Sequence, residues 1–260
     1  MLRASMLGTP ILLASILAVA GAQARITKTA IPKNVSAAVA DSSRPAADKA
    51  RDAERKPAEC LAFAGIKPGE SVIELAPGKG YYTRLLSLSV GPKGKLLVIA
   101  SPRRPDAPAD APAPSAPIHA IADDPHYGNI TISEQRAKEL SLPPDSADLV
   151  WTSQNYHDFH NVKDIEVANL DKVIYNTLKP GGVFLVIDHV AEAGSGFRDT
   201  NTLHRVDPEA VKKEVESAGF KYEGESEVLR NKDDPHTAKV FDPSIQGHTD
   251  QFVFRFRKPK

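Results

Sequence analysis

The chain has 260 residues, 41% hydrophobic and 25% charged, and its 33 basic and 33 acidic residues give a formal net charge of zero. This length and composition suit one globular domain. Because there is no basic excess, we expect no nucleic-acid partner. The single cysteine, Cys60, excludes an internal disulfide and any site built from several cysteines. It lies in an apolar stretch, where we expect a buried small side chain rather than a nucleophile.

The N-terminus has the pattern of a secretory signal peptide. Arg3 provides a basic start, residues 6–20 are mostly apolar, and Ala22-Gln23-Ala24 offers the small residues of a cleavage site. We expect residues 1–24 to be cleaved off, because the apolar run is short for a membrane span of about 20 residues. The mature protein should then be exported, to the periplasm of a Gram-negative host, and have no membrane anchor.

The folded domain is expected over residues 45–260, after a flexible lead-in at 25–44 that is polar and weakly patterned. Alanines recur at helical spacing over 46–53, and Pro57 is expected to open a second helix. These helices should pack at one edge of the core and cover the mouth of the ligand site.

A strand, a tight loop and a helix are predicted over the stretch 72–83. An apolar run that contains the acid Glu74 leads into a turn with Gly78 and Gly80, and helical spacing follows. Glycine in such a turn lets the backbone adopt a positive φ and lets a ligand approach closely. The arrangement is typical of the first half of a βαβ unit.

Apolar runs of strand length alternate with helical patterns in the rest of the chain. Strands are predicted at 96–99, 130–132, 147–152, 183–187, 222–229 and 251–256, and helices at 82–90, 167–178 and 208–218. The proline- and alanine-rich residues 101–118 predict a surface insertion without a regular helix or inner strand. The order of elements predicts a three-layer α/β sandwich.

The chain resembles the class I S-adenosylmethionine-dependent methyltransferases, and among them a group of bacterial proteins with signal peptides. The matching segments are 72–80, 91–95, 148–151, 178–182, 203–207 and 249–253. The acid Glu74 before the loop, and Thr83 where a dinucleotide-binding loop has its third glycine, favour this family. The resemblance implies a Rossmann-like, seven-stranded, mostly parallel sheet with the last strand antiparallel, and S-adenosylmethionine as cofactor at the carboxyl ends of the strands.

The resemblance also implies which residues bind the cofactor. They lie in the loop and after the following strands: Glu74, Ala76, Gly78, Gly80, Tyr82, Ser101, Glu134 and Gln154. Ala76 replaces the first loop glycine of the family, and we expect it to keep a negative φ. Ala100-Ser101 stands where the family usually has an acid for the ribose hydroxyls, and Asp106 or Asp110 are candidates to replace that acid.

Histidines and aspartates gather after two of the predicted strands and in the connection that follows the second of them, which holds His204. His157, Asp158 and His189 are the candidate catalytic residues, since a histidine can take a proton from a methyl acceptor near neutral pH. Histidine and carboxylate side chains also suit Zn, Fe or Mn, so a metal site is a second interpretation of the same set, although we assign no metal ligands from sequence. A purely structural role is the third.

The predicted function is therefore S-adenosylmethionine-dependent methyl transfer to a small molecule. The alternative rests on the missing ribose acid and on the histidine and aspartate cluster. It is an exported protein of the same fold that has lost methyl transfer and either acts as a lyase or hydrolase through these histidines and aspartates, with or without a metal, or binds a small ligand.

Overall fold

A computed structural model describes residues 30–108 and 110–260, so the predicted signal peptide at 1–24 lies outside the described residues. One seven-stranded sheet runs through this part of the chain in the order β3-β2-β1-β4-β5-β7-β6. The strands are β1 (Ser71–Leu75), β2 (Lys95–Ala100), β3 (Ile130–Glu134), β4 (Ala147–Ser153), β5 (Leu178–His189), β6 (Lys221–Glu225) and β7 (Gln251–Arg257).

The sheet is parallel from β3 to β5, and β7 runs antiparallel to both β5 and β6. The predicted Rossmann-like, mostly parallel sheet with an antiparallel last strand is confirmed. Strand order reverses between β1 and β4. These two strands are parallel neighbours, with Val72 opposite Leu149 and Leu75 opposite Thr152. Chain segments leave these two strands toward opposite faces of the sheet, which makes this point the usual ligand position in open α/β sheets.

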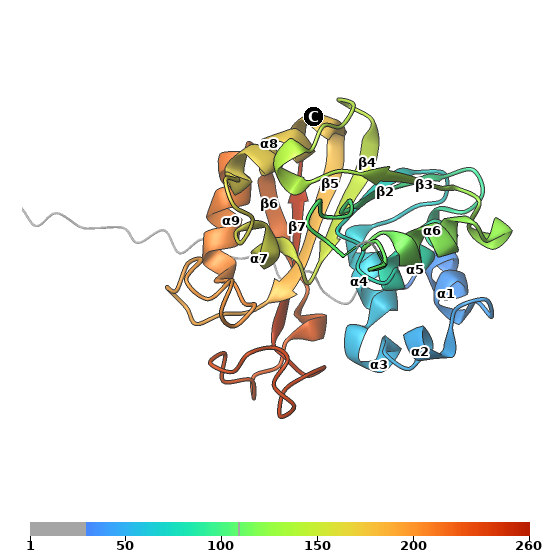
Figure 1. Ribbon diagram of the computed structural model, residues 1–260. Helices are drawn as coiled ribbons and strands as arrows, with labels where there is room; N and C mark the ends of the chain where they lie inside the picture. Colours follow the sequence, from blue (N-terminus) through green and yellow to red (C-terminus); the bar gives the residue numbers. More distant parts are fainter. Residues whose placement is uncertain (1–29, 109) are drawn as a thin grey trace, which may run out of the picture.

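Helices cover both faces of the sheet and its lower edge in Figure 1. They are α1 (Lys33–Ala40), α2 (Ala46–Lys49), α3 (Asp52–Arg55), α4 (Pro57–Ala64), α5 (Tyr81–Val90), α6 (Ala116–Ala122), α7 (Tyr156–Phe159), α8 (Val167–Thr177) and α9 (Pro208–Ser217), with short 3-10 helices at Pro125–Tyr127, Ala137–Glu139 and Glu227–Leu229. The α1, α4 and α5 helices pack on one face and α8 and α9 on the other, as the three-layer prediction requires.

The apolar runs of the inner strands supply both cores because successive side chains point to opposite faces. Leu149 and Trp151 of β4 are buried on the α5 face, whereas Val150 is buried on the α8 face. Cys60 is fully buried in the first of these cores, and burial raises the pKa of its thiol to about 12. The expectation of a small buried side chain is confirmed.

The flexible lead-in predicted for 25–44 is wrong for its described C-terminal part. Residues 33–40 form α1, which buries Val35 and Ala38 and packs against α5. Arg44 is also buried, and its guanidinium makes a bidentate ion pair with Asp52 at 2.6 and 2.9 Å. The pattern was missed because α1 buries only a narrow stripe of small side chains.

Two further boundaries differ from the sequence prediction. In the insertion at 101–118, residues 101–108 and 110–115 form no helix or strand, but the last residues belong to α6, where Pro117 is accommodated in the first turn. The strand predicted at 222–229 ends at Glu225, and a 3-10 helix covers 227–229.

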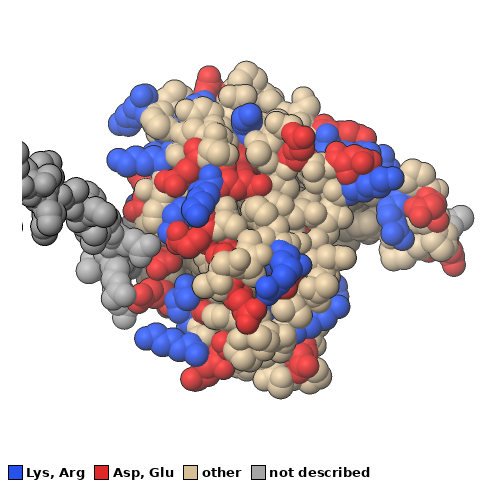
Figure 2. Space-filling model, turned by 90° about the vertical axis from the view of Figure 1, so that its left-hand side faces the viewer, with Lys and Arg blue, Asp and Glu red and all other residues tan. Residues whose placement is uncertain are grey.

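None of the helices in the described part of the chain is long and apolar enough to span a membrane. Acidic and basic side chains are interspersed on the face shown in Figure 2. This face therefore carries mixed charge, in keeping with the net charge of zero.

Candidate active site

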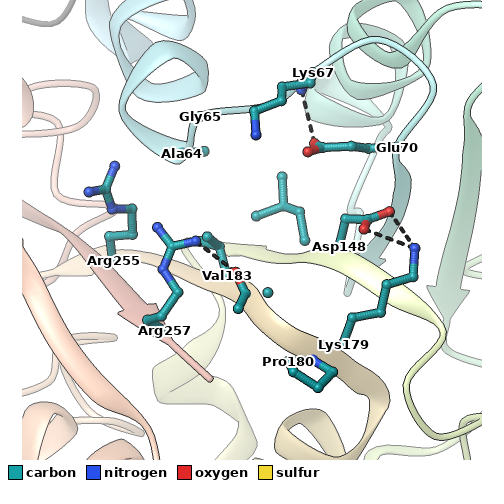
Figure 3. Close-up of a pocket in the computed structure, with 13 residues that line it drawn as sticks. Ala64, Gly65, Lys67, Glu70, Asp148, Lys179, Pro180, Val183, Arg255 and Arg257 are labelled. Carbon is teal, nitrogen blue, oxygen red and sulfur yellow. Dashed lines mark hydrogen bonds and ion pairs between the residues drawn. The ribbon is translucent and has the colours of Figure 1, made fainter. Parts of the chain in front are cut away.

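Two cavities in the described part of the chain lie at opposite ends of the parallel strands. The first, of about 410 Å³, lies at the amino ends of the parallel strands (Figure 3). Its charged groups are largely satisfied within the protein: Lys179 pairs with Asp148 at 2.9 Å, and Arg257 donates to the carbonyl of Gly181 at 2.7 Å. Since ligands of open α/β sheets bind at the carboxyl ends of the strands, we do not assign this cavity as the active site.

The second cavity, of about 580 Å³, lies at the carboxyl ends of β1, β2 and β4. It is lined by the loop 76–79, by residues 100–101 after β2 and 153–155 after β4, by side chains between residues 47 and 55, and by Tyr81, Pro114 and Asp158. Its volume is in the range of small-molecule and cofactor sites. We call it the cofactor cavity.

The loop that forms the floor of the cofactor cavity has an unusual backbone. Gly78 and Gly80 take positive φ values of 58° and 84°, as expected. Ala76 also takes a positive φ, 48°, so the expected negative φ is wrong. For a residue with a Cβ this conformation costs about 1–2 kcal/mol. Two hydrogen bonds hold it there: the Ala76 amide donates to Ile99 at 3.1 Å, and Asn155 Nδ2 donates to the Ala76 carbonyl at 2.8 Å.

The two loop glycines have different purposes. A Cβ on Gly78 would meet no atom within 4 Å, and Gly78 lines the cavity, so its small size keeps that space open. A Cβ on Gly80 would lie 2.2 Å from the Ile121 side chain, because α6 packs against the loop there. Gly80 therefore permits helix packing and does not line the cavity.

Glu74 lies beneath the loop rather than in the cavity. It is buried, and Thr83 Oγ1 donates to its Oε2 at 2.6 Å. Burial raises the pKa of Glu74 to about 7, and the hydrogen bond from Thr83 only partly opposes that rise. Tyr82 is buried beside it and donates to the Arg55 carbonyl at 3.3 Å. Both predicted cofactor residues thus support the loop from below.

The remaining predicted cofactor residues divide in the same way. Ser101 and Gln154 line the cofactor cavity together with Ala76 and Gly78, whereas Glu134 does not. Glu134 instead accepts hydrogen bonds from Ser115 at 2.5 Å and bonds to His119 at 3.0 Å, and so fixes α6.

No acid follows β2 at the cavity. Asp106 and Asp110, the candidates to replace the ribose acid, are exposed and do not line the cavity. The acids that do line it are Asp48 from α2 and Asp158 from α7.

Arg55 was missed by the sequence analysis. Its guanidinium lies 4.5 Å above the ring of Tyr81 and 4.9 Å above that of Tyr82, and it donates to Gln154 Oε1 at 2.7 Å. Among the described residues no carboxylate forms an ion pair with it, and burial lowers its pKa. Arg51, four residues earlier, lines the same cavity. Two basic residues at this spacing lie on one face of a helix, and this pattern in the sequence could have pointed to Arg55.

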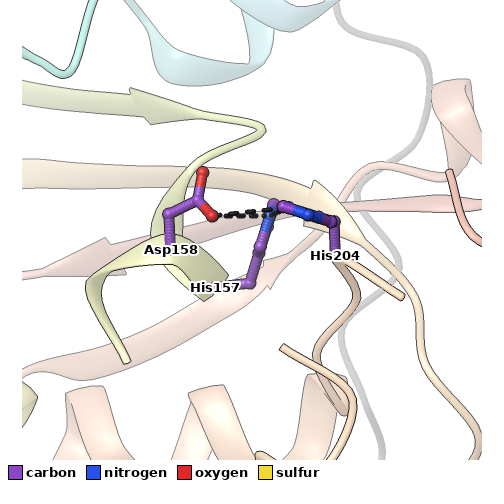
Figure 4. A group of neighbouring side chains, drawn as sticks. All are labelled: His157, Asp158 and His204. Carbon is purple, nitrogen blue, oxygen red and sulfur yellow. Dashed lines mark hydrogen bonds and ion pairs between the residues drawn. The ribbon is translucent and has the colours of Figure 1, made fainter. Parts of the chain in front are cut away.

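The three predicted catalytic residues lie near one another but in different environments. Asp158 lines the cofactor cavity, and its Oδ1 lies 3.4 Å from His157 Nε2. His157 is buried, and its Nδ1 bonds to Asp188 Oδ1 at 2.8 Å. Burial disfavours the charged imidazole, but the Asp188 carboxylate outweighs it and raises the pKa of His157. His204, which the sequence places in the connection after β5, completes the group in Figure 4, with Nδ1 3.3 Å from His157 Nε2.

His189 lies on the other side of the cluster. Its ring Nδ1 bonds to Thr249 Oγ1 at 2.7 Å, and burial lowers its pKa to about 4, so its imidazole is neutral at pH 7. It lines a smaller cavity of about 120 Å³ that shares Arg55 and Gln154 with the cofactor cavity. The two cavities therefore adjoin, and Phe241 on the smaller one is among the exposed large apolar side chains.

Solved structures of known proteins share this architecture. An arsenic(III) S-adenosylmethionine methyltransferase from Chlamydomonas reinhardtii superposes with a TM-score of 0.54 and 19% identity, over 89% of this chain and 75% of that one. The cyclase SpnF superposes with a TM-score of 0.57 and 18% identity, over 82% of this chain and 81% of that one. The chain has the fold of the class I S-adenosylmethionine-dependent methyltransferases.

Sequence comparison gives a similar but partial match. A ubiquinone/menaquinone biosynthesis C-methyltransferase, UbiE, from Hydrogenovibrio crunogenus is 27% identical over 133 residues, which are 49% of this chain and 45% of that protein. This chain thus matches less than half the length of that curated relative. No protein-family model matches this chain. None of these proteins supports the alternative of a lyase or hydrolase. The cyclase among them shows that the fold alone does not determine the reaction.

The environment of Glu74 makes a prediction about stability. An unfolded glutamate has its ordinary pKa of 4.5, whereas folded Glu74 has a pKa of about 7, so the folded state holds this proton more tightly. The stabilisation from protonated Glu74 is complete below pH 4.5 and is lost as the pH rises through 7. Relative to Glu74→Gln, wild-type stability should fall by about 3 kcal/mol across this window and then stay level.

Urea unfolding of both proteins without ligand, from pH 5 to pH 8, measures this difference. Glutamine keeps the size of the side chain and an acceptor for Thr83, so the comparison isolates the charge. A stability difference that is independent of pH over the range would show that Glu74 is not held in a raised-pKa environment.

Proposed function

We propose that the protein is an S-adenosylmethionine-dependent methyltransferase that acts on a small molecule, and that it belongs to the exported bacterial group of this family. The observation that carries the proposal is the position of the cofactor cavity. It opens where the strand order reverses between β1 and β4, on a loop whose Gly78 leaves free space. Methyltransferase neighbours of the same fold support this reading.

The polar groups of the cavity fit the amino-acid part of the cofactor. Arg55, which lacks a carboxylate partner among the described residues, fits the cofactor carboxylate. On the nucleoside side, Ser101 offers a hydroxyl for the ribose in place of the usual acid. A hydroxyl in place of a charged bidentate acceptor should weaken binding by about 1–3 kcal/mol.

The chain has little covalent chemistry to perform. When bound, S-adenosylmethionine supplies a methyl group that its sulfonium already activates, so the protein mainly positions the two reactants. We propose that the acceptor enters the smaller adjoining cavity, which His189 lines, and that the neutral imidazole of His189 forms a hydrogen bond with it. The small volume of that cavity, about 120 Å³, supports a small molecule as acceptor rather than a nucleic acid.

Calorimetry of residues 25–260 with S-adenosylmethionine and S-adenosylhomocysteine tests the cofactor assignment. We expect wild-type dissociation constants below about 1 mM, which corresponds to about −4 kcal/mol. In Gly78→Leu the new side chain should occupy the open space of the cavity and weaken binding of both ligands at least tenfold.

Gly65→Leu is the matched control, because Gly65 also has a positive φ, 77°, and open space around its Cβ position. It lines the cavity at the other edge of the sheet, so its strain should be similar while ligand affinity stays unchanged. Equal affinity of Gly78→Leu and wild type, or no binding by the wild type, would argue against the proposal.

We further propose that the protein is exported, on the basis of the signal-peptide pattern at 1–24. In a Gram-negative host the mature protein should appear in the periplasmic fraction. N-terminal sequencing of that material should begin at Arg25. Full-length protein confined to the cytosolic fraction would contradict export.

A further inference from the structure

We propose that His157, Asp158 and His204 form a binding site for one divalent transition-metal ion. Each residue offers one ligand atom, and the three atoms lie within 4.8 Å of one another at the rim of the cofactor cavity (Figure 4). Two imidazole nitrogens and one carboxylate oxygen are a ligand set that Zn²⁺, Mn²⁺ and Fe²⁺ accept.

The spacing of the three atoms suits a metal ion. His157 Nε2 lies 3.3 Å from His204 Nδ1 and 3.4 Å from Asp158 Oδ1, and His204 Nδ1 lies 3.5 Å from Asp158 Oδ1. Ligand atoms about 2.1 Å from a tetrahedral zinc ion lie about 3.4 Å from one another. The three atoms therefore make one nearly equilateral face of such a tetrahedron before any side chain moves.

Asp188 orients His157 for this purpose. It is fully buried, its Oδ1 lies 2.8 Å from His157 Nδ1, and its Oδ2 accepts the backbone amide of His157 at 2.7 Å. A proton on Nδ1 directed at the carboxylate leaves the Nε2 lone pair facing Asp158 and His204. A buried carboxylate behind a histidine is the usual support of a metal-binding imidazole.

A second buried pair holds His204 in place. The neighbouring Arg205 is fully buried and forms a bidentate ion pair with Asp234 at 2.8 and 3.0 Å. It also donates to the Val190 carbonyl, just after β5. His204 itself has a φ of 56°, an uncommon conformation that this anchored segment maintains.

With a proton on His157 Nδ1 directed at Asp188, His157 Nε2 and Asp158 Oδ1 both present lone pairs to the space that they share with His204 Nδ1. A cation at the centre satisfies all three at once. Its remaining coordination positions would be open to water or to an oxygen ligand, and Asp158 connects the site to the cofactor cavity.

If the proposed methyltransferase function is right, the metal favours a methyl acceptor that carries an oxygen ligand. The ring of His204 lies 5.0 Å from the ring of Phe241, which lines the smaller cavity, so an acceptor held there could place a hydroxyl, enol or carboxylate oxygen at the open position. This consequence rests on the proposed function, whereas metal binding itself does not.

Metal analysis tests the site directly. We expect residues 25–260, purified with a histidine-free affinity tag from medium supplied with Zn²⁺, Mn²⁺ and Fe²⁺, to retain about one metal ion per chain. After EDTA treatment, competition with a chromophoric chelator should give a Zn²⁺ affinity that His204→Ala weakens at least hundredfold. Asp188→Asn should weaken it about tenfold, because it disturbs only the orientation of His157.

His126→Ala is the control, since His126 also pairs with an aspartate, Asp41, at 3.3 Å but lies outside the cluster. Its zinc affinity should equal that of the wild type, and thermal melts should show that every variant is folded. Absence of retained metal, or equal Zn²⁺ affinity of folded His204→Ala and wild type, would overturn the metal site.

Calorimetry with S-adenosylmethionine on the same EDTA-treated protein separates the two proposals. Cofactor binding without metal binding would defeat only the metal site. Metal binding without cofactor binding would leave the metal site in place and defeat the methyltransferase proposal.

Discussion

The arrangement depends on the parallel pairing of β1 with β4 at the point where the strand order reverses. The chain leaves β1 toward the α5 face and β4 toward the α8 face, so no connection fills the space beyond their ends. Asn155 ties these two exits together: its Nδ2 donates to the carbonyls of Ala76 at 2.8 Å and Ser153 at 3.0 Å. The cavity is therefore a consequence of topology that one amide side chain holds in shape.

Buried ionisable side chains lie on both sides of the cofactor cavity. Glu74 lies under the loop with its carboxyl kept from ionising readily by burial, while Arg55 lies above it without a carboxylate partner among the described residues. On the far side, Asp188 fixes His157, and the Arg205–Asp234 pair fixes the segment that carries His204. His157 and the segment that carries His204 are thus each oriented by a buried partner, which is what a site that must position reactants requires.

The fold was predictable because its inner strands are continuous apolar runs and its turns carry glycine and proline, as at 178–182. The site was only half predictable. Ala76, Gly78, Ser101, Gln154 and Asp158 follow strands and line the cavity, but proximity to the loop in sequence did not show that Glu74 points beneath it.

The missed features all depend on contacts between distant segments. Arg55, for example, reaches Gln154 across 99 residues. Such pairs are set by packing of whole elements and leave no local pattern in one sequence. The φ of Ala76 was missed for the same reason, since the bonds from Asn155 and to Ile99 that hold it are long-range.

The most direct test of the central claim is a crystal structure of residues 25–260 grown with S-adenosylhomocysteine. We expect the ligand between the loop 76–79 and residues 153–155, with its carboxylate at Arg55. A ligand bound instead at the other edge of the sheet, between Lys179 and Arg255, would contradict it, as would crystals that exclude the ligand at millimolar concentration.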